Sequence, residues 1–271
     1  MISIIMPSLN PNLNKICSTL DCIMQNSGEY EVILVLQRAS VEIEGKIKKH
    51  LSFNDKLIVI NDTGIGISRA RNIAIKASTG EWILLLDDDV YIENNTIQNL
   101  NKQLSVNTMF YYGNALVHNT DTHYVRYYVV DRDLSIWSYN RVCSISLVIN
   151  RKAFDRIGWF DENLGSGCEL GSSEESDLVI RALLNKIKIR YLKDYSVYHE
   201  KAAHSLQKVE NYAKGAGALY RKHMASKNLK LYAKFLSDLA LRVLFLFSFQ
   251  RKRYVFFKGF FKGFVKYSDY K

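Results

Sequence analysis

Residues 81–89 read Glu81-Trp82-Ile83-Leu84-Leu85-Leu86-Asp87-Asp88-Asp89. The five apolar residues follow one another without the gaps of a helical pattern, which is typical of a strand buried on both faces of a parallel sheet. The run then ends in three carboxylates. Ligands of open α/β sheets bind beyond the carboxyl ends of the strands. The segment therefore predicts an acidic cleft at that edge of a sheet.

The acidic triplet, residues 87–89, has two interpretations. Adjacent like charges repel one another, and a hard cation such as Mg²⁺ or Mn²⁺, shared with substrate phosphates, would relieve that repulsion. Alternatively, the triplet is a solvated turn that caps the next helix, a place that aspartate favours. The segments on either side are needed to decide between them.

The order of elements before the triplet indicates the fold class. Strands are predicted over residues 2–6, 32–36 and 57–60, and helices over residues 13–23 and 68–76. This alternation predicts an α/β fold with a mostly parallel, doubly wound sheet flanked by helices. No G-x-G-x-x-G follows the first strand, and no G-x-x-x-x-G-K-[ST] occurs, which argues against a Rossmann dehydrogenase and a P-loop NTPase.

Composition predicts a folded protein of a reducing compartment. Of 271 residues, 48% are hydrophobic, which is enough for a large core. The four cysteines are scattered without metal-ligand spacing. The N-terminal run lacks the basic start of a signal peptide, and no stretch has the length of a membrane-spanning helix. A cytoplasmic location is therefore expected.

The net charge of +10 is concentrated at one end of the chain. Residues 201–271 carry 16 Lys and Arg against 3 Asp and Glu, whereas the first 200 residues are slightly acidic. Phe and Lys alternate through residues 256–264, which predicts an amphipathic helix lying on an anionic membrane surface. The alternative is a helical pair that packs on the main domain or forms a dimer. Nucleic acid is not expected, because no binding motif occurs and the acidic cleft repels phosphates.

A second acidic cluster, Glu174-Glu175-Ser176-Asp177, opens a predicted helix after the irregular, glycine-rich residues 159–173, which we expect to be mobile. Acids complement the positive end of a helix, but three exceed what a cap needs, and one could act as a general base. Two further strands are predicted over residues 187–192 and 196–198. His199 ends the second of them and is a candidate metal ligand.

These motifs together resemble a known family. In order, the chain carries Ser68-Arg69-Ala70-Arg71-Asn72, Gly80-Glu81-Trp82, the acidic triplet, Phe160-Asp161-Glu162, Glu174-Glu175-Ser176-Asp177-Leu178 and Val197-Tyr198-His199. The order and spacing are similar to those of the inverting family 2 glycosyltransferases of GT-A fold. The resemblance implies a GT-A (Rossmann-like) catalytic domain in residues 1–225. Beyond it, the composition of residues 226–271 predicts a basic, aromatic helical extension that associates with a membrane.

The resemblance also implies residue roles. The nucleotide-binding residues would be Pro7, Ser8, Gln37, Asp62, Arg71, Asp87 and Asp88. The ligands of an Mn²⁺ or Mg²⁺ ion that bridges the diphosphate would be Asp89, Asp87 and His199. Gln37 stands where the family usually has Asp, and an amide can still hydrogen-bond a base edge, so the nucleobase stays open. Glu175 matches the catalytic base, with Glu174 as the alternative.

The implied activity is metal-dependent transfer of a sugar from a UDP- or dTDP-sugar to a hydroxyl of a lipid-linked glycan, with inversion. By resemblance this belongs to bacterial O-antigen or capsule synthesis, peripherally on the inner face of the plasma membrane, with a homo-oligomer as an open option. Two alternatives remain. A nucleotidyltransferase also uses strand-end acids and a metal, but residues 7–11 lack the basic, glycine-rich phosphate loop it would need. A membrane-bound scaffold with a degenerate cleft is the other alternative.

Overall fold

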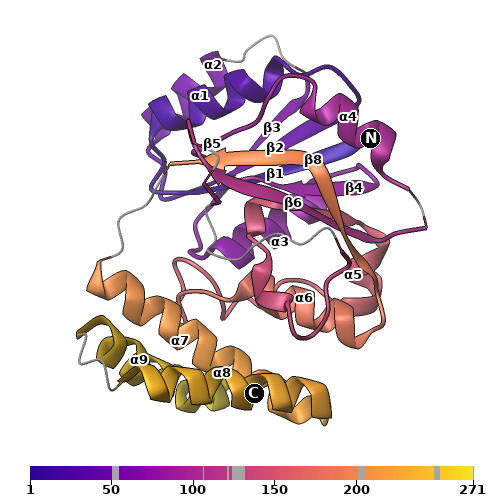
Figure 1. Ribbon diagram of the computed structural model, residues 1–271. Coiled ribbons are helices and arrows are strands. Elements are labelled where there is room, and N and C mark those ends of the chain that lie inside the picture. Colours follow the sequence, from indigo (N-terminus) through magenta and orange to yellow (C-terminus); the bar gives the residue numbers. More distant parts are fainter. Residues whose placement is uncertain are drawn as a thin grey trace.

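A mixed sheet lies at the centre of the computed structural model, which describes residues 1–50, 55–105, 107–120, 122–123, 132–200, 205–246 and 251–270 (Figure 1). The strand order is β3-β2-β1-β4-β7-β6-β8-β5. The strands are β1 (Ile2–Leu9), β2 (Tyr30–Gln37), β3 (Leu57–Asp62), β4 (Trp82–Leu85), β5 (Val90–Tyr91), β6 (Phe110–Val117), β7 (Leu147–Asn150) and β8 (Ile189–His199).

The first half of the sheet is parallel, as predicted. β1 pairs with β2 and with β4, and β2 pairs with β3, all in parallel register. In β1, Ile4 and Met6 point to one hydrophobic core, whereas Ile5 points to the other. Burial on both faces explains why these strands read as continuous apolar runs.

The second half is mixed. β7 is antiparallel to β4 and β6, β8 is parallel to β6, and β5 is antiparallel to β8. The two strands predicted over residues 187–192 and 196–198 are a single strand, β8. Its pairing with β6 is irregular between Tyr112 and Asn114, and the Asn114 side chain donates to the carbonyl of Lys193 at 3.0 Å. This irregularity lets the strand continue through its polar middle.

Helices cover both faces of the sheet (Figure 1). On one face lie α1 (Leu13–Met24), α2 (Val41–His50) and α4 (Thr96–Gln103). On the other lie α3 (Ile67–Ala77), α5 (Lys152–Ile157) and α6 (Glu174–Leu184). Two short 3₁₀ turns, η1 (Tyr139–Arg141) and η2 (Ser144–Ser146), lead into β7.

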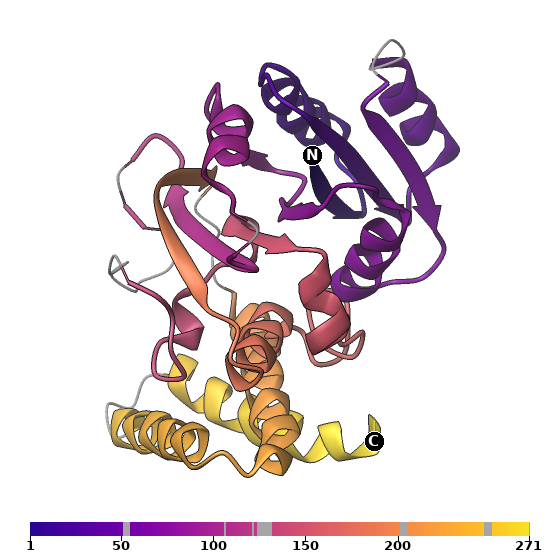
Figure 2. The same cartoon turned by 90° about the vertical axis from the view of Figure 1, so that its right-hand side faces the viewer.

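The C-terminal helices form a further layer beyond α6 (Figures 1 and 2). They are α7 (Leu206–His223), α8 (Leu229–Leu246) and α9 (Arg251–Lys266), with the turns η3 (Met224–Ser226) and η4 (Tyr267–Tyr270). Among the described residues, no helix is both long and apolar enough to cross a membrane.

The contact between α7 and α9 depends on glycine. A Cβ atom on Gly217 would lie 1.9 Å from the carbonyl oxygen of Phe260, and one on Gly263 would lie 1.9 Å from that of Lys214. The two helix backbones can approach this closely only because both positions lack a side chain. Helices on either side of the predicted domain boundary after residue 225 therefore pack together, and the boundary itself stays a prediction.

Candidate active site

The three aspartates of the acidic triplet follow the end of β4, and each contacts a different residue. Asp88 accepts a short hydrogen bond from the Ser8 hydroxyl, Asp87 contacts Arg71 and Asp89 contacts His199. Burial raises the pKa values of Asp87 and Asp88. The hydrogen bond from His199 lowers the pKa of Asp89 to about 2. Asp89 is thus the member of the triplet best suited to hold a cation as a carboxylate.

Asp89 and His199 are brought together by the sheet. Val90, in β5, pairs with His199 at the end of β8, and the imidazole Nε2 lies 3.0 Å from Asp89 Oδ1. The other ring nitrogen, Nδ1, donates to the Glu200 carbonyl oxygen at 2.6 Å, so Nε2 is the nitrogen that could bind a metal once it gives up the proton that it shares with Asp89. The half-exposed Lys15 ammonium lies 3.0 Å from Asp89 Oδ2. The Lys15 ammonium thus already places a positive charge beside the Asp89 carboxylate. Asp89 and His199 together provide donor atoms suited to Mn²⁺ or Mg²⁺.

The predicted set of three metal ligands is not assembled. In the described part of the chain, no three His, Cys, Asp or Glu side chains form a group that could hold a metal. The reason is that Asp87 faces Arg71, whose Nη2 lies 3.2 Å from Asp87 Oδ1. The structure therefore supports Asp89 and His199 as candidate ligands and gives Asp87 a different neighbour.

Arg71 joins the two acidic clusters. This side chain of α3 is fully buried, and its Nη1 donates to Glu174 Oε1 at 3.0 Å while its Nη2 donates to Asp87. Within the described residues its Nε has no hydrogen-bond acceptor. One guanidinium therefore holds together carboxylates that lie 87 residues apart in the chain.

The start of α6 presents two glutamates to the same space. Ser173, just before the helix, has a φ of 73°, a left-handed conformation that is uncommon for residues other than glycine. This turn places Glu174 and Glu175 as the first two helical residues. Burial and the neighbouring Glu174 carboxylate raise the pKa of Glu175 to about 8. Glu174 is committed to Arg71, so Glu175 is the better candidate for a base.

The glycine-rich segment, residues 159–173, is joined to α3 by hydrogen bonds, and its mobility stays a prediction. The buried Ser68 hydroxyl donates to the Leu164 carbonyl at 2.6 Å, and the Ile67 N–H donates to the Ser166 carbonyl at 2.9 Å. Asn72 exchanges two hydrogen bonds of 3.0 Å with the backbone of Phe160. The segment thus packs against the N-terminal turns of α3.

Two of the predicted nucleotide-binding residues, Gln37 and Asp62, form hydrogen bonds within the protein. The Gln37 amide donates to Asp62 at 2.9 Å, and its oxygen accepts from the Gly66 N–H at 3.0 Å. Asp62 also accepts from Arg69 and from the Gly64 N–H. These bonds give Gln37 and Asp62 a role in shaping the turn before α3, while a base contact by Gln37 stays a prediction.

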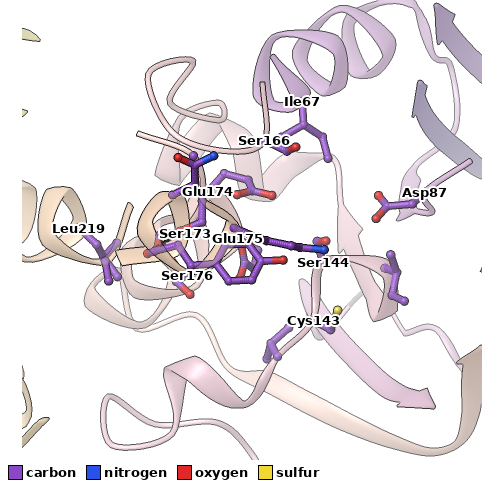
Figure 3. Close-up of a pocket in the computed structure, with 18 of the residues that line it drawn as sticks. Ile67, Asp87, Cys143, Ser144, Ser166, Ser173, Glu174, Glu175, Ser176 and Leu219 are labelled. Carbon is purple, nitrogen blue, oxygen red and sulfur yellow. Dashed lines mark hydrogen bonds between the residues drawn. The ribbon is translucent and has the colours of Figure 1, made fainter. Parts of the chain in front are cut away.

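A cavity of about 910 Å³ unites these groups. Figure 3 shows Asp87 and Leu219 on opposite sides, with Glu174 and Glu175 between them. The predicted residues that line it are Pro7, Gln37, Asp87, Asp88, Asp89, Glu174, Glu175 and His199. Ser8, Asp62 and Arg71 are not among the described residues that line the cavity. Each instead contacts a residue that does: Ser8 contacts Asp88, Asp62 contacts Gln37, and Arg71 contacts Asp87.

Sequence reasoning missed the other half of the cavity lining. Residues of η1, η2, α7 and α9 contribute, among them Tyr139, Ser144, Lys208, Leu219 and Phe256. Their sequence signal was weak because it consists of ordinary helical and loop residues. Only tertiary packing brings them to the acidic clusters.

Comparisons with known proteins agree with this geometry. Residues 3–157, more than half of the chain, match the family described as glycosyl transferase family 2. An Escherichia coli protein, UDP-Glc:alpha-D-GlcNAc-diphosphoundecaprenol beta-1,3-glucosyltransferase WfgD, is 30% identical over 125 residues, or 45% of this chain and 48% of the relative. The match therefore spans about half the length of that relative. An uncharacterized glycosyltransferase of Haemophilus influenzae is 24% identical over 213 residues, covering 74% of this chain and 69% of its own.

Solved structures share the fold. S. aureus TarS 1–349 in complex with UDP-GlcNAc superposes with a TM-score of 0.63 at 19% identity, covering 86% of this chain and 69% of that one. The mannosyltransferase PcManGT from Pyrobaculum calidifontis, in complex with GDP-Man and Mn²⁺, gives a TM-score of 0.62 at 13% identity, covering 97% and 86%. The GT-A prediction is confirmed. On its matched sequence, the chain belongs to glycosyl transferase family 2.

Proposed function

We propose that the protein transfers a sugar from a UDP- or dTDP-sugar, with Mn²⁺ or Mg²⁺, to a hydroxyl of a lipid-linked glycan, with inversion at the anomeric carbon. The reaction belongs to bacterial surface-polysaccharide synthesis and takes place at the inner face of the plasma membrane. The observation that carries the proposal is the Arg71 bridge between Asp87 and Glu174. It puts the strand-end acids and the helix-start glutamates in one cavity.

The residues fit the needs of such a transfer. A cation held by Asp89 and His199 would neutralise the leaving diphosphate electrostatically. Pro7 and Gln37 line the end of the cavity where the nucleotide would lie. Glu175 would take the proton from the acceptor hydroxyl, and its raised pKa makes it a stronger base than an ordinary carboxylate. Residues of the segment 159–173, which line part of the cavity, would limit the access of water.

The acceptor class is supported by a relative. The name of the E. coli protein WfgD states that it acts on alpha-D-GlcNAc-diphosphoundecaprenol, a sugar diphosphate on a polyisoprenoid. We carry this class of acceptor over to the present chain, together with the location at a membrane that such an acceptor requires.

The outer face of α9 supports membrane contact. Tyr254, Phe261 and Val265 are exposed large hydrophobic residues, and Lys258 is exposed beside them. Their spacing places all four on one side of the helix. Aromatic and apolar side chains beside ammonium groups suit the boundary between headgroups and acyl chains. The inner face of α9 packs on α7, so packing and membrane contact use different faces of one helix.

The proposal is tested with a panel of nucleotide sugars and a GlcNAc-α-diphosphate acceptor that carries an undecyl chain, with Mn²⁺, with Mg²⁺ or with EDTA. Transfer that requires a divalent cation and inverts the anomeric centre is expected. Turnover unaffected by EDTA would remove the metal from the mechanism. If calorimetry detects no binding of UDP or dTDP in Mn²⁺ and no sugar is transferred, the cleft is degenerate and the proposal is wrong.

A further inference from the structure

The cavity is lined by the triplet, Pro7 and Gln37 and also by residues of α7 and α9. In Figure 3, Leu219 of α7 lies across the pocket from Asp87, and the two glutamates lie between. A nucleotide sugar bound at the strand ends would leave the α7 end open for another molecule.

The inverting mechanism indicates that this second molecule is the acceptor. In a single displacement the acceptor hydroxyl attacks from the side opposite the leaving diphosphate, with the base beside it. Because the candidate base Glu175 separates the two ends of the cavity, the α7 end is the acceptor side. This step rests on the proposed function.

The residues of α7 that line the cavity change from charged to apolar along the helix. Lys208, Tyr212, Ala216 and Leu219 lie at intervals of three or four residues, so they form one stripe along α7. The stripe is about 16 Å long, given a rise of about 1.5 Å per residue. It begins at a cation and ends at an apolar side chain, and Phe256 of α9 lines the same cavity.

Lys208 is the single lysine or arginine among the described residues that line the cavity. Its ammonium lies 5.7 Å from the centre of the Tyr212 ring. The triplet and the two glutamates make the rest of the cavity acidic, and those carboxylates would repel an acceptor phosphate that came near them. An anionic group of the acceptor therefore has one favourable place, at Lys208.

We infer that the stripe of α7, with Phe256, binds the isoprenoid diphosphate portion of the acceptor. Lys208 would pair with the diphosphate, and Leu219 and Phe256 would contact the first isoprenoid units. α7 packs against α9, whose outer face carries Tyr254, Phe261 and Val265. A polyisoprenoid chain could thus pass from the cavity toward a membrane beside this helix.

The probe is farnesyl diphosphate, added in EDTA without vesicles and measured by calorimetry. Wild-type protein should bind it, and Lys208→Gln should weaken binding about tenfold or more, as expected for the loss of a charged hydrogen bond. Lys214→Gln is the matched control, because Lys214 lies on the same helix but does not line the cavity, and it should bind as wild type. Inorganic pyrophosphate and farnesol should each bind more weakly than the intact probe.

A second variant tests the space itself. Ala216→Phe fills the stripe without removing a core side chain, and it should abolish probe binding while UDP binding in Mn²⁺ is retained. Equal weakening by Lys208→Gln and Lys214→Gln would reveal only surface electrostatics and overturn the inference. So would displacement of the probe by UDP, or an absence of probe binding in a protein that binds UDP. If UDP itself fails to bind and no sugar is transferred, the proposed function fails instead.

Discussion

The hydroxyl of Tyr267 donates a 2.8 Å hydrogen bond to Asp161 Oδ2, across 106 residues of chain. The Lys222 ammonium lies 2.7 Å from the same oxygen and 2.9 Å from Asp177 Oδ1, and His223 Nε2 lies 2.9 Å from Asp177. Asp177 is fully buried in α6, three and two residues after Glu174 and Glu175. The final turn of the chain is thereby connected to the helix that carries the candidate base.

Tyr267→Phe tests this connection. The substitution removes the hydrogen bond to Asp161 but keeps the ring, which is buried against Leu164 and Leu170. We expect the free energy of unfolding to fall by about 1 kcal/mol, as for other buried hydrogen bonds. Urea denaturation measures it. Tyr270→Phe, which removes an exposed bond to Glu169, should stay within about 0.5 kcal/mol of wild type. Equal losses in both variants would contradict the role of Tyr267.

Arg71→Met should be far more damaging. It removes the positive charge between Glu174 and Asp87, and breaking a buried ion pair by deleting one partner costs about 3–5 kcal/mol. Urea denaturation measures the loss. The double variant Arg71→Met/Glu174→Gln should recover part of it, because the carboxylate left without its partner is neutralised. No recovery would mean that Arg71 stabilises the protein through packing alone.

The sequence predicted the first half of the fold because its signal is local. Apolar runs such as residues 32–36 and 83–86 carry the buried, parallel strands in their own composition, and they match β2 and β4 closely. The sequence predicts two strands in place of β8 because Lys193 and Asp194 interrupt its apolar pattern. What carries the strand through that interruption is a contact with Asn114 of β6, 79 residues away. No local pattern encodes such a partner.

The candidate site was predictable to a similar extent. The acidic clusters are visible in the sequence as neighbouring carboxylates. The hydrogen bonds of Gln37 with Asp62 and Gly66, in contrast, depend on where β2 ends relative to α3. Lys15 was missed because a lysine in a helix is ordinary until Asp89 lies 3.0 Å away. Gly217 and Gly263 gave a weak hint of the α7–α9 contact, since small residues permit close helix packing.

Glu175 should give transfer its pH dependence. As a base it must be deprotonated, so kcat/KM should rise with pH through a limb near pH 8, where its pKa lies in the free enzyme. Activity at pH 7 should be roughly a tenth of the plateau. Glu175→Gln should lower transfer by about 10²–10⁴-fold while UDP binding is retained. Steady-state rates and calorimetry measure the two effects. A limb that survives in Glu175→Gln would point to another group.

The same pKa shift predicts how stability varies with pH. The folded protein holds a proton on Glu175 up to about pH 8, whereas a glutamate in the unfolded chain loses it near its ordinary value of 4.5. Between these limits the folded state binds more protons, so this group makes the free energy of unfolding fall as the pH rises. Glu175→Gln should flatten that slope in urea denaturation series at several pH values. An unchanged slope would show that Glu175 is not the group responsible.

The outer face of α9 should govern attachment to membranes. Tyr254 and Val265 are each 66% exposed, so replacing both with Ser removes apolar surface without opening the contact with α7. Sedimentation with vesicles of phosphatidylglycerol and phosphatidylcholine should show about tenfold or more weaker binding, the effect of losing two apolar insertions. Val41→Ser is the matched control, because Val41 is 86% exposed on α2, far along the chain from the basic helices. Since the basic residues remain in every variant, a loss of binding separates apolar insertion from charge attraction. Pelleting of the double variant equal to that of wild type would mean that this face does not enter the bilayer.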